Sequence, residues 1–262
     1  MEMHIICYWL TKNFYVTPGG VHADGKTANR LITFQDGSYL ELIAFVDDDP
    51  KNKEGHWWGE KKLGIIDFAF TTDEDAKTHY EGLSKRLAGS EGSISYAPPK
   101  AGGRKREDGQ ELKWEVTFPN DVKRGQLPFF CHDVTPRTLR VPSAPENIEH
   151  PSKVYGVKSL TLVLPKERCI ELVKQYPVIL SIDSAAQAPK TAALPVNNVH
   201  PVKDTPGSTL YVRYPADGED ELEKLVAEQG VVLTDLVLGG FDSISKQKLD
   251  VQEGLGGIFL EA

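Results

Sequence analysis

The sequence predicts an α+β protein with mostly antiparallel strands, and three observations support this class. Apolar residues alternate with period two in several short segments, as they do in half-buried strands. The pairs Asp24-Gly25 and Asp108-Gly109 favour tight reversals between such strands. A strand followed by a helix occurs twice, and further strands come after it each time. This order is typical of helices that cover one face of a twisted antiparallel sheet.

The first half of the chain reads as strands around one helix. The expected elements are strands at residues 14–16, 31–34 and 38–45, a strand at 64–70, a helix over 72–87, and strands at 94–96 and 114–118. The helix is expected because Thr72 can cap its start and apolar residues from Ala76 to Leu87 share one face. The pairs Gly19-Gly20 and Gly102-Gly103 are interpreted as loops between strands.

The second half repeats the strand and helix order. We expect a strand at 156–164, a helix over 165–175, a strand at 209–213, a helix over 218–229 and a strand at 257–261. Pro165 suits the first turn of its helix. Residues 133–150 are rich in proline and read as a connector, and residues 185–206 read as a long loop. The predicted modules are 1–62, 63–150 and 151–262.

The composition is that of an ordinary globular protein, and it does not exclude a small anionic substrate. Of its 262 residues, 40% are hydrophobic and 26% charged, which is ordinary for a chain with a sizeable core. A net charge of −8 argues against nucleic acid or an anionic membrane as the main partner. Three cysteines without a paired spacing fit free thiols in a reducing compartment. No membrane span of ~18–20 apolar residues and no signal peptide is visible, so a cytoplasmic location is expected.

Glu41 is the most informative single residue, because it is the only charged residue in the apolar segment 38–45. A strand of this composition is expected to be covered on both faces. A carboxylate there costs several kcal/mol unless it is paired, hydrogen-bonded, protonated or bound to a cation. Perturbed carboxylates of this kind gather in functional sites. The alternative is an edge strand from which Glu41 reaches solvent.

Several motifs resemble a known family. They are Pro18-Gly19-Gly20-Val21-His22, the segment from Asp24 to Ile32, the run Ser38-Tyr39-Leu40-Glu41-Leu42-Ile43, Gly55-His56-Trp57-Trp58, and Leu127-Pro128-Phe129-Phe130-Cys131-His132-Asp133. Together they resemble the glyoxalase-like domain of the glyoxalase/bleomycin-resistance/dioxygenase superfamily, also called the vicinal oxygen chelate superfamily. Among its members the resemblance is greatest to the fungal type, and it covers about residues 10–165.

The resemblance implies tandem βαβββ modules whose curved sheets enclose a cleft. In the metal enzymes of the superfamily, the first and last strands of two modules supply the ligands. By this resemblance Glu41 and His132 take the last-strand positions, and His4 takes the first-strand position of the first module. The fourth position falls on Ile65, which cannot bind a metal. The implied ion is divalent, with zinc, nickel, manganese or iron as candidates.

His132 also has a second interpretation, as a buried histidine that is hydrogen-bonded to a backbone carbonyl or to Asp133. Its neighbour Cys131 raises the question of a cysteine–histidine nucleophile. Adjacent residues of a strand point to opposite faces, so Cys131 and His132 are not expected to cooperate.

Other residues are candidates for the wall of the cleft. His22 lies in a glycine-rich segment and could act as a general base or orient a substrate; the alternative is an exposed turn residue. Asn29 could bind a substrate carbonyl or cap a turn. His56 and Trp57 could wall a pocket or pack a loop onto the core. His150 could line the cleft from the connector or serve the structure.

Two functions remain open at this point. The first is a metal-dependent lyase or isomerase in which Glu41, His132 and His4 or His22 hold an ion that polarises a carbonyl or enediolate oxygen of a small metabolite. Glu41 or a nearby histidine would then move a proton. The second is a metal-free module that sequesters an apolar small molecule in the same cleft. Both predict a small-molecule ligand without nucleic acid or membrane, and a homodimer is left open as the assembly.

Overall fold

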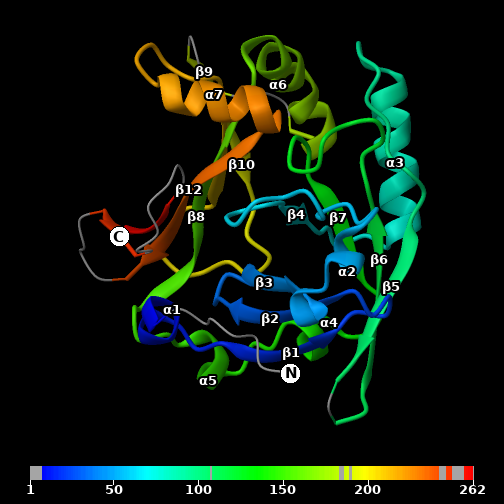
Figure 1. Ribbon diagram of the computed structural model, residues 1–262, viewed down its shortest axis with the longest axis vertical. Helices are drawn as coiled ribbons and strands as arrows, with labels where there is room; N and C mark the ends of the chain where they lie inside the picture. The colour runs from blue at the N-terminus through cyan, green and yellow to red at the C-terminus, as the bar shows by residue number, and fades with distance from the viewer. Residues whose placement is uncertain are drawn as a thin grey trace.

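Three β-sheets with the longer helices on their outer sides make up the molecule (Figure 1). The computed structural model describes residues 8–106, 108–182, 186–188, 191–241, 246–249 and 257–261. Helices and strands are both present in quantity and most strand pairs are antiparallel, so the predicted α+β class is confirmed.

The first sheet follows a short helix and lies in the lower part of Figure 1. Its elements are α1 (Tyr8–Asn13), β1 (Thr17–Val21), β2 (Thr27–Thr33) and β3 (Tyr39–Phe45). The strand order is β1-β2-β3, so β3 is an edge strand. The strand expected at 14–16 is therefore wrong, because these residues only link α1 to β1.

The interpretation of Gly19-Gly20 as a loop is also wrong, and Gly19 gives the physical reason. A Cβ atom at Gly19 would lie 1.7 Å from the carbonyl oxygen of Asn29 on β2, so no other residue fits there. The pairing register also shifts between Thr17 and Gly20, as it does at a β-bulge. The glycine pair that reads as a loop is thus part of a strand that approaches its neighbour closely.

The second sheet forms a complete βαβββ unit. Its elements are β4 (Ala69–Phe70), α3 (Ala76–Ala88), β5 (Lys100–Lys105), β6 (Glu111–Thr117) and β7 (Phe129–Asp133), with strand order β4-β7-β6-β5. Helix α3 covers one face of this sheet, and its Leu83 and Leu87 share a core with Phe130. The strand expected at 64–70 is reduced to β4, and residues 94–96 supply only an isolated bridge at Tyr96.

Helix α3 begins four residues later than expected. Asp75 caps it, because its Oδ1 atom accepts the backbone N–H groups of Lys77 and Thr78 at 3.0 Å. Thr72, the expected cap, instead places its hydroxyl 3.1 Å from the Nε2 atom of His132.

The third sheet is the largest. Its elements are β8 (Val154–Val163), α6 (Lys166–Leu180), β9 (Ala186–Ala188), β10 (Thr191–Val196), β11 (Ser208–Arg213), α7 (Asp220–Gln229), β12 (Val232–Gly240), β13 (Gln247–Lys248) and β14 (Ile258–Glu261). The strand order is β13-β14-β12-β8-β11-β10-β9. The long loop expected at 185–206 is wrong, since β10 lies within it, and β12 was not predicted.

The short elements between the sheets are η1 (Val46–Asp48), α2 (Pro50–Lys53), α4 (Arg137–Arg140) and α5 (Pro145–Ile148). The last two replace the predicted connector. The main core is shared by the second and third sheets, with Leu83 and Phe130 packed in one cluster with Leu162 and Leu172. Because packing crosses these boundaries, the division into modules 1–62, 63–150 and 151–262 stays a prediction. In the described part of the chain, no helix is long and apolar enough to span a bilayer.

The first two sheets meet edge to edge, and this junction positions the candidate site. A β-bridge pairs His22 with Arg104, and the backbone N–H of Ala23 donates to the carbonyl oxygen of Gly103 at 3.1 Å. Strand β1 therefore adjoins β5, and the two sheets continue into one another (Figure 1). Paired residues of neighbouring strands project to the same face, so His22 and Arg104 share one face of this combined sheet.

Candidate functional site

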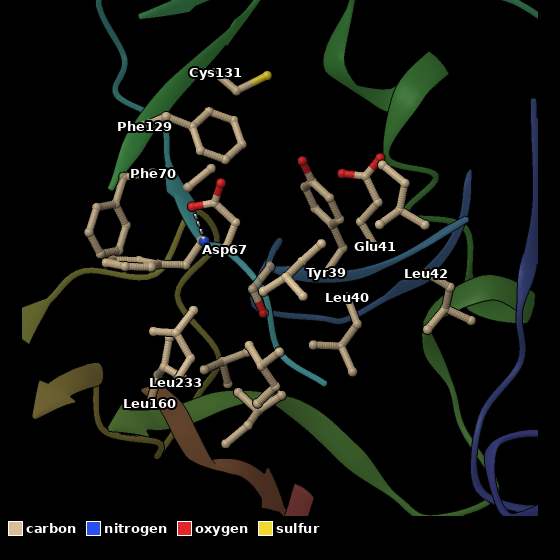
Figure 2. Close-up of a pocket in the computed structure, with 18 of the residues that line it drawn as sticks. Tyr39, Leu40, Glu41, Leu42, Asp67, Phe70, Phe129, Cys131, Leu160 and Leu233 are labelled. Carbon is tan, nitrogen blue, oxygen red and sulfur yellow. Dashed lines mark hydrogen bonds between the residues drawn. The ribbon is translucent and has the colours of Figure 1, made fainter. Parts of the chain in front are cut away.

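A cavity of about 2460 Å³ lies between the sheets and contains the whole of β3 in its wall. Apolar side chains from all three sheets line it, among them Leu40, Ile65, Phe70, Phe129, Leu160 and Leu233. Figure 2 shows that Tyr39 and Glu41 extend to one side of β3, while Leu40 extends to the other side, where Leu160 and Leu233 lie. The polar and the apolar walls of the cavity thus come from alternate residues of a single strand.

Two residues fix the carboxylate of Glu41: Asn29, which lies on β2, and His22, which directly follows β1. Its Oε1 atom accepts a hydrogen bond of 2.7 Å from the Nδ2 atom of Asn29 and lies 3.5 Å from the Nε2 atom of His22. The Nδ1 atom of His22 lies 2.7 Å from the hydroxyl of Thr27, which fixes the ring. The structure therefore brings three residues singled out in the sequence, Glu41, His22 and Asn29, into one cluster.

Strand pairing explains why these three residues meet. Asn29 pairs with Ile43 and Leu31 pairs with Glu41, so Asn29 and Glu41 are diagonal neighbours on the same face of β2 and β3. His22 follows β1 immediately and its backbone N–H bonds to Thr27, at the start of β2. The sequence separation between the three residues is bridged by two hairpin turns.

The expectation that the strand of Glu41 is covered on both faces is wrong. Strand β3 is an edge strand, and 29% of the Glu41 side chain is exposed. Glu41 is exposed as a whole residue, and it lines the cavity. Burial by itself raises the pKa of Glu41, but the interactions with His22 and Asn29 and the charge of Arg140 outweigh it and hold the pKa below its usual value. Glu41 is therefore ionised at neutral pH.

Tyr39 lies two residues before Glu41 on the same face of β3 and was not singled out in the sequence. Its hydroxyl oxygen accepts a hydrogen bond of 2.8 Å from the Nη1 atom of Arg140. Arg140 is fixed in turn by a bidentate pair with Asp133, in which the two side chains are 8% and 9% exposed. Burial raises the pKa of Tyr39 despite the opposing charge of Arg140, so the hydroxyl keeps its proton.

Period two around Glu41 could have identified Tyr39, since residues i and i+2 of a strand share a face. Arg140 carried no comparable signal, because it lies in a short helix of the proline-rich segment, about a hundred residues from β3. It reaches the site only through the tertiary fold.

His132 and Cys131 point to opposite sides of β7, as the strand geometry predicts. Cys131 lines the cavity, and burial raises the pKa of its thiol to about 11. His132 faces helix α3, with its ring centroid 5.0 Å from that of His79. Burial lowers the pKa of His132 and that of His79, the latter to about 4. The described contacts of His132 are with residues such as Thr72 and His79, and the pairing of His132 with Glu41 stays a prediction.

The remaining candidates lie away from the cavity wall. His56 is buried against Phe45 and accepts the backbone N–H of Trp58, while Trp57 is 47% exposed and packs on Phe118. His150 is 1% exposed, and its two ring nitrogens contact the N–H of Tyr15 and the carbonyl oxygen of Thr33. His150 thus anchors the structure. His4 lies outside the described residues.

The described residues do not fit the implied divalent metal. No three histidine, cysteine, aspartate or glutamate side chains converge in the part of the chain that the structure describes. The nitrogen of His22 and the oxygen of Glu41 do converge, but the amide N–H group of Asn29 is directed at both of them. Arginine charges act on the same carboxylate. A zinc site in a protein has three or four protein ligands. Here only two possible ligand atoms of described residues converge, both lie near the amide of Asn29, and the surroundings are positively charged.

Comparisons with known proteins agree with this fold. The chain matches the family model described as "Glyoxalase-like domain" over residues 7–201. It is similar to the crystal structure of a hypothetical protein from Staphylococcus aureus, with 11% identity, a TM-score of 0.65, and coverage of 95% of this chain and 90% of the other. At this identity the similarity concerns the fold alone.

A weaker similarity is found to the structure of a mutant of 4-hydroxymandelate synthase from Streptomyces coelicolor. The identity is 13% and the TM-score 0.46, with coverage of 87% of this chain and 64% of the other. No curated protein matches the chain. The matching family model does not distinguish a fungal type, so this part of the resemblance is not supported.

Proposed function

Because this chain belongs to the glyoxalase-like domain family, we propose that it is a lyase or isomerase which removes a proton from the carbon next to a carbonyl group of a small metabolite. The observation that carries the proposal is the placement of Glu41 and Tyr39 on one face of β3, in the wall of the cavity. One residue is an ionised carboxylate and the other a protonated hydroxyl. A base next to a hydrogen-bond donor is the arrangement that enolisation requires.

Glu41 supplies the base. Asn29 and His22 hold its Oε1 atom, which leaves the Oε2 atom to receive the proton of the substrate. The lowered pKa keeps the carboxylate ionised over the neutral range but makes it a weak base. The reaction therefore depends on stabilising the enolate that forms, and this is the role of the neighbouring donor.

Tyr39 supplies that donor. Its oxygen already accepts the N–H group of Arg140, so its own hydrogen is free to donate to a carbonyl oxygen of the substrate. The guanidinium increases the acidity of the hydroxyl and stabilises negative charge nearby. In the proposed step the C–H bond breaks, its electron pair forms the C=C bond, and the C=O pair moves to the oxygen held by Tyr39. Where the deprotonated carbon carries a hydroxyl, transfer of the hydroxyl proton to the enolate oxygen and return of the first proton to the former carbonyl carbon complete an isomerisation. Where the carbon next to the deprotonated one carries a leaving group, its departure with the electron pair completes an elimination.

Exchange of substrate protons with solvent tests the proposal. A panel of small ketones, aldehydes and 2-oxo acids is incubated with the protein in D2O, and loss of the C–H signals is followed by NMR. We expect exchange with the wild type, a loss of about 10²–10⁴-fold in Glu41→Gln and of about 10²–10³-fold in Tyr39→Phe. Glu111→Gln, an exposed glutamate on β6, is the matched control. Exchange that survives in Glu41→Gln overturns the proposal.

A second candidate is binding without turnover. The cavity volume of about 2460 Å³ exceeds the ~300–1,000 Å³ of ordinary small-molecule pockets, and its walls are largely apolar, which favours a large apolar ligand. This alternative predicts no exchange with any compound of the panel. It also predicts that an apolar dye binds wild type and Glu41→Gln equally well.

A further inference from the structure

Arg104 is a buried cation without a partner among the described residues. Its side chain belongs to β5, and the residue is only 6% exposed. Within that part of the chain, its enclosed Nε and Nη1 atoms have no hydrogen-bond partner. Each of the other buried guanidinium groups near this site, by contrast, is paired: Arg140 and Arg137 both bind Asp133. An unpaired buried charge is rare, because burial removes its hydration without replacement.

The β-sheet junction directs Arg104 toward the candidate site. Arg104 and His22 form the bridge between the first two sheets, so their side chains leave the same face. The Nη1 atom lies 3.3 Å from the position that a Cβ atom of Gly20 would take, and Gly20 lines the cavity. The guanidinium thus lies next to Gly20, behind the cavity wall rather than in it, in the side-chain space that glycine leaves open on the face that carries His22, Asn29 and Glu41.

The charges around Arg104 leave a positive excess. Three guanidinium groups, those of Arg104, Arg137 and Arg140, face the two carboxylates of Glu41 and Asp133. Glu41 attracts Arg104 from a distance beyond an ion pair, and Asp133 is already shared by the other two arginines. One positive charge of this group is therefore uncompensated by the described residues, inside a chain whose net charge is −8.

We infer that Arg104 binds a carboxylate of the substrate, so that the enzyme acts on small carbonyl compounds that carry a carboxylate, such as 2-oxo acids. The part of the inference that concerns the reaction rests on the proposed function. The part that concerns the binding of an anion rests only on Arg104. A guanidinium matches a carboxylate in shape and charge through two parallel N–H groups. A 2-oxo acid held in this way presents its carbonyl oxygen next to the carboxylate, and its C–H group one carbon further. These are the groups that Tyr39 and Glu41 are proposed to act on.

Binding of charged and neutral analogues tests the inference. Pyruvate and phenylpyruvate serve as the anionic probes, and pyruvamide replaces the carboxylate of pyruvate by a neutral amide. Calorimetric titration of the wild type is expected to give, for at least one of the two acids, a dissociation constant at least about tenfold lower than that of pyruvamide. In Arg104→Met this preference disappears, while Arg104→Lys retains part of it because the charge remains.

Arg106→Met is the matched control. Arg106 lies two residues from Arg104 but is partly exposed and paired with Asp108, so its loss removes the same charge without changing the site. It is expected to keep the preference within about twofold. Arg104→Met should unfold at the same or a higher urea concentration than the wild type, because an unpaired buried charge is removed. A lower midpoint would instead assign Arg104 a structural role and overturn the inference.

The outcomes separate this inference from the proposed function. If neither acid binds more tightly than pyruvamide, or if Arg104→Met keeps the preference, the carboxylate site is wrong even when protons exchange. If the acids bind through Arg104 but no compound exchanges protons, the carboxylate site stands and the proposed reaction is wrong. Glu41→Gln retains Arg104 and is expected to keep the preference for the acids.

Discussion

Two groups of residues near β7 have similar side chains in different surroundings. At β3, Glu41, His22, Tyr39 and Arg140 are linked by hydrogen bonds and by opposite charges. We call these four residues the cavity cluster. On the helix side, His79 and His132 lie against each other under α3, and the Nδ1 atom of each ring is buried with no partner among the described residues.

The comparison shows that the interaction partners of a titratable residue, and not its burial alone, indicate whether the residue has a functional role. In the cavity cluster, charges and donors lower the pKa of Glu41 although burial opposes this. In the histidine pair, burial is the main cause of the lowered pKa of both rings. The first arrangement stabilises a charged group in a cavity. The second keeps two buried histidine rings uncharged where they pack against each other, as expected for residues with a structural role.

The largest expected effect separates the two regions by activity. Glu41→Gln should lower proton exchange by about 10²–10⁴-fold, since the base is lost while the shape is kept. His132→Asn should leave exchange within about threefold of the wild type and lower stability instead. Exchange rates and urea midpoints of both variants check this. A loss of exchange in His132→Asn at unchanged stability would contradict the assignment of the pair to structure.

Breaking the Arg140–Asp133 pair should have the next largest effect. Arg140→Met leaves Asp133 with one arginine and removes the partner of Tyr39, and both Arg140 and Asp133 are nearly buried. The free energy of unfolding should fall by about 3–5 kcal/mol, as measured by urea denaturation. Lys77→Met, which breaks an exposed pair with Glu81, is the control and should change it by about 0–1 kcal/mol. Equal losses in both variants would mean that the cavity cluster does not depend on this pair.

The two regions should also fail in different pH windows. The folded pKa of His79 is lowered to about 4, so the unfolded chain binds protons more readily. Stability is therefore complete above the unfolded pKa of about 6.5 and is lost as the pH falls toward 4, by a few kcal/mol in total. Glu41 also has a lowered pKa, and its contribution is lost only below its ordinary carboxyl pKa.

His79→Phe isolates the histidine window. The variant keeps the aromatic contact with Phe130 but cannot be protonated. Urea midpoints at pH 7 and pH 5 should differ less in His79→Phe than in the wild type. If the difference between the two pH values is the same in both proteins, the loss of stability arises elsewhere.

The smallest expected effect concerns Thr72, which contacts the histidine pair. Thr72→Val removes the hydroxyl next to the Nε2 atom of His132 and keeps the volume of the side chain. Stability should fall by about 1 kcal/mol, with no change in proton exchange. Calorimetry resolves this difference. A change in exchange would show that the histidine pair, whose His79 also lines the cavity, contributes to the site.

Local patterns in the sequence predicted the elements whose signals are local. The apolar alternation around Glu41 predicted β3, and the proline at 165 predicted the start of α6 within a residue. Glycine misled the prediction twice, at Gly19-Gly20 and Gly102-Gly103, because both pairs lie in strands where another strand or the Trp114 ring approaches closely. Whether another part of the chain comes close to a glycine depends on the strand or side chain that packs against it, and the local sequence around the glycine does not identify that neighbour.

The candidate site was predictable in part for the same reason. His22, Asn29 and Glu41 come from two adjacent hairpins, so short-range pairing brings them together. Arg104 and Arg140 come from distant segments, and neither their burial nor their surroundings can be read from neighbouring residues. The pairing of Glu41 with His132 came from the family resemblance and stays a prediction, since the described contacts of His132 are with Thr72 and His79.

The hydrogen bond between Arg140 and Tyr39 spans 101 positions of the chain. Contacts of such long range are made late in folding, because the entropy of loop closure is lost before they form. During synthesis, β3 is complete long before Arg140, which binds its tyrosine, has been made. A partly synthesised chain can therefore contain Glu41 and Tyr39 without their arginine, and under the proposed function activity would report that the whole chain has folded rather than that its first sheet exists.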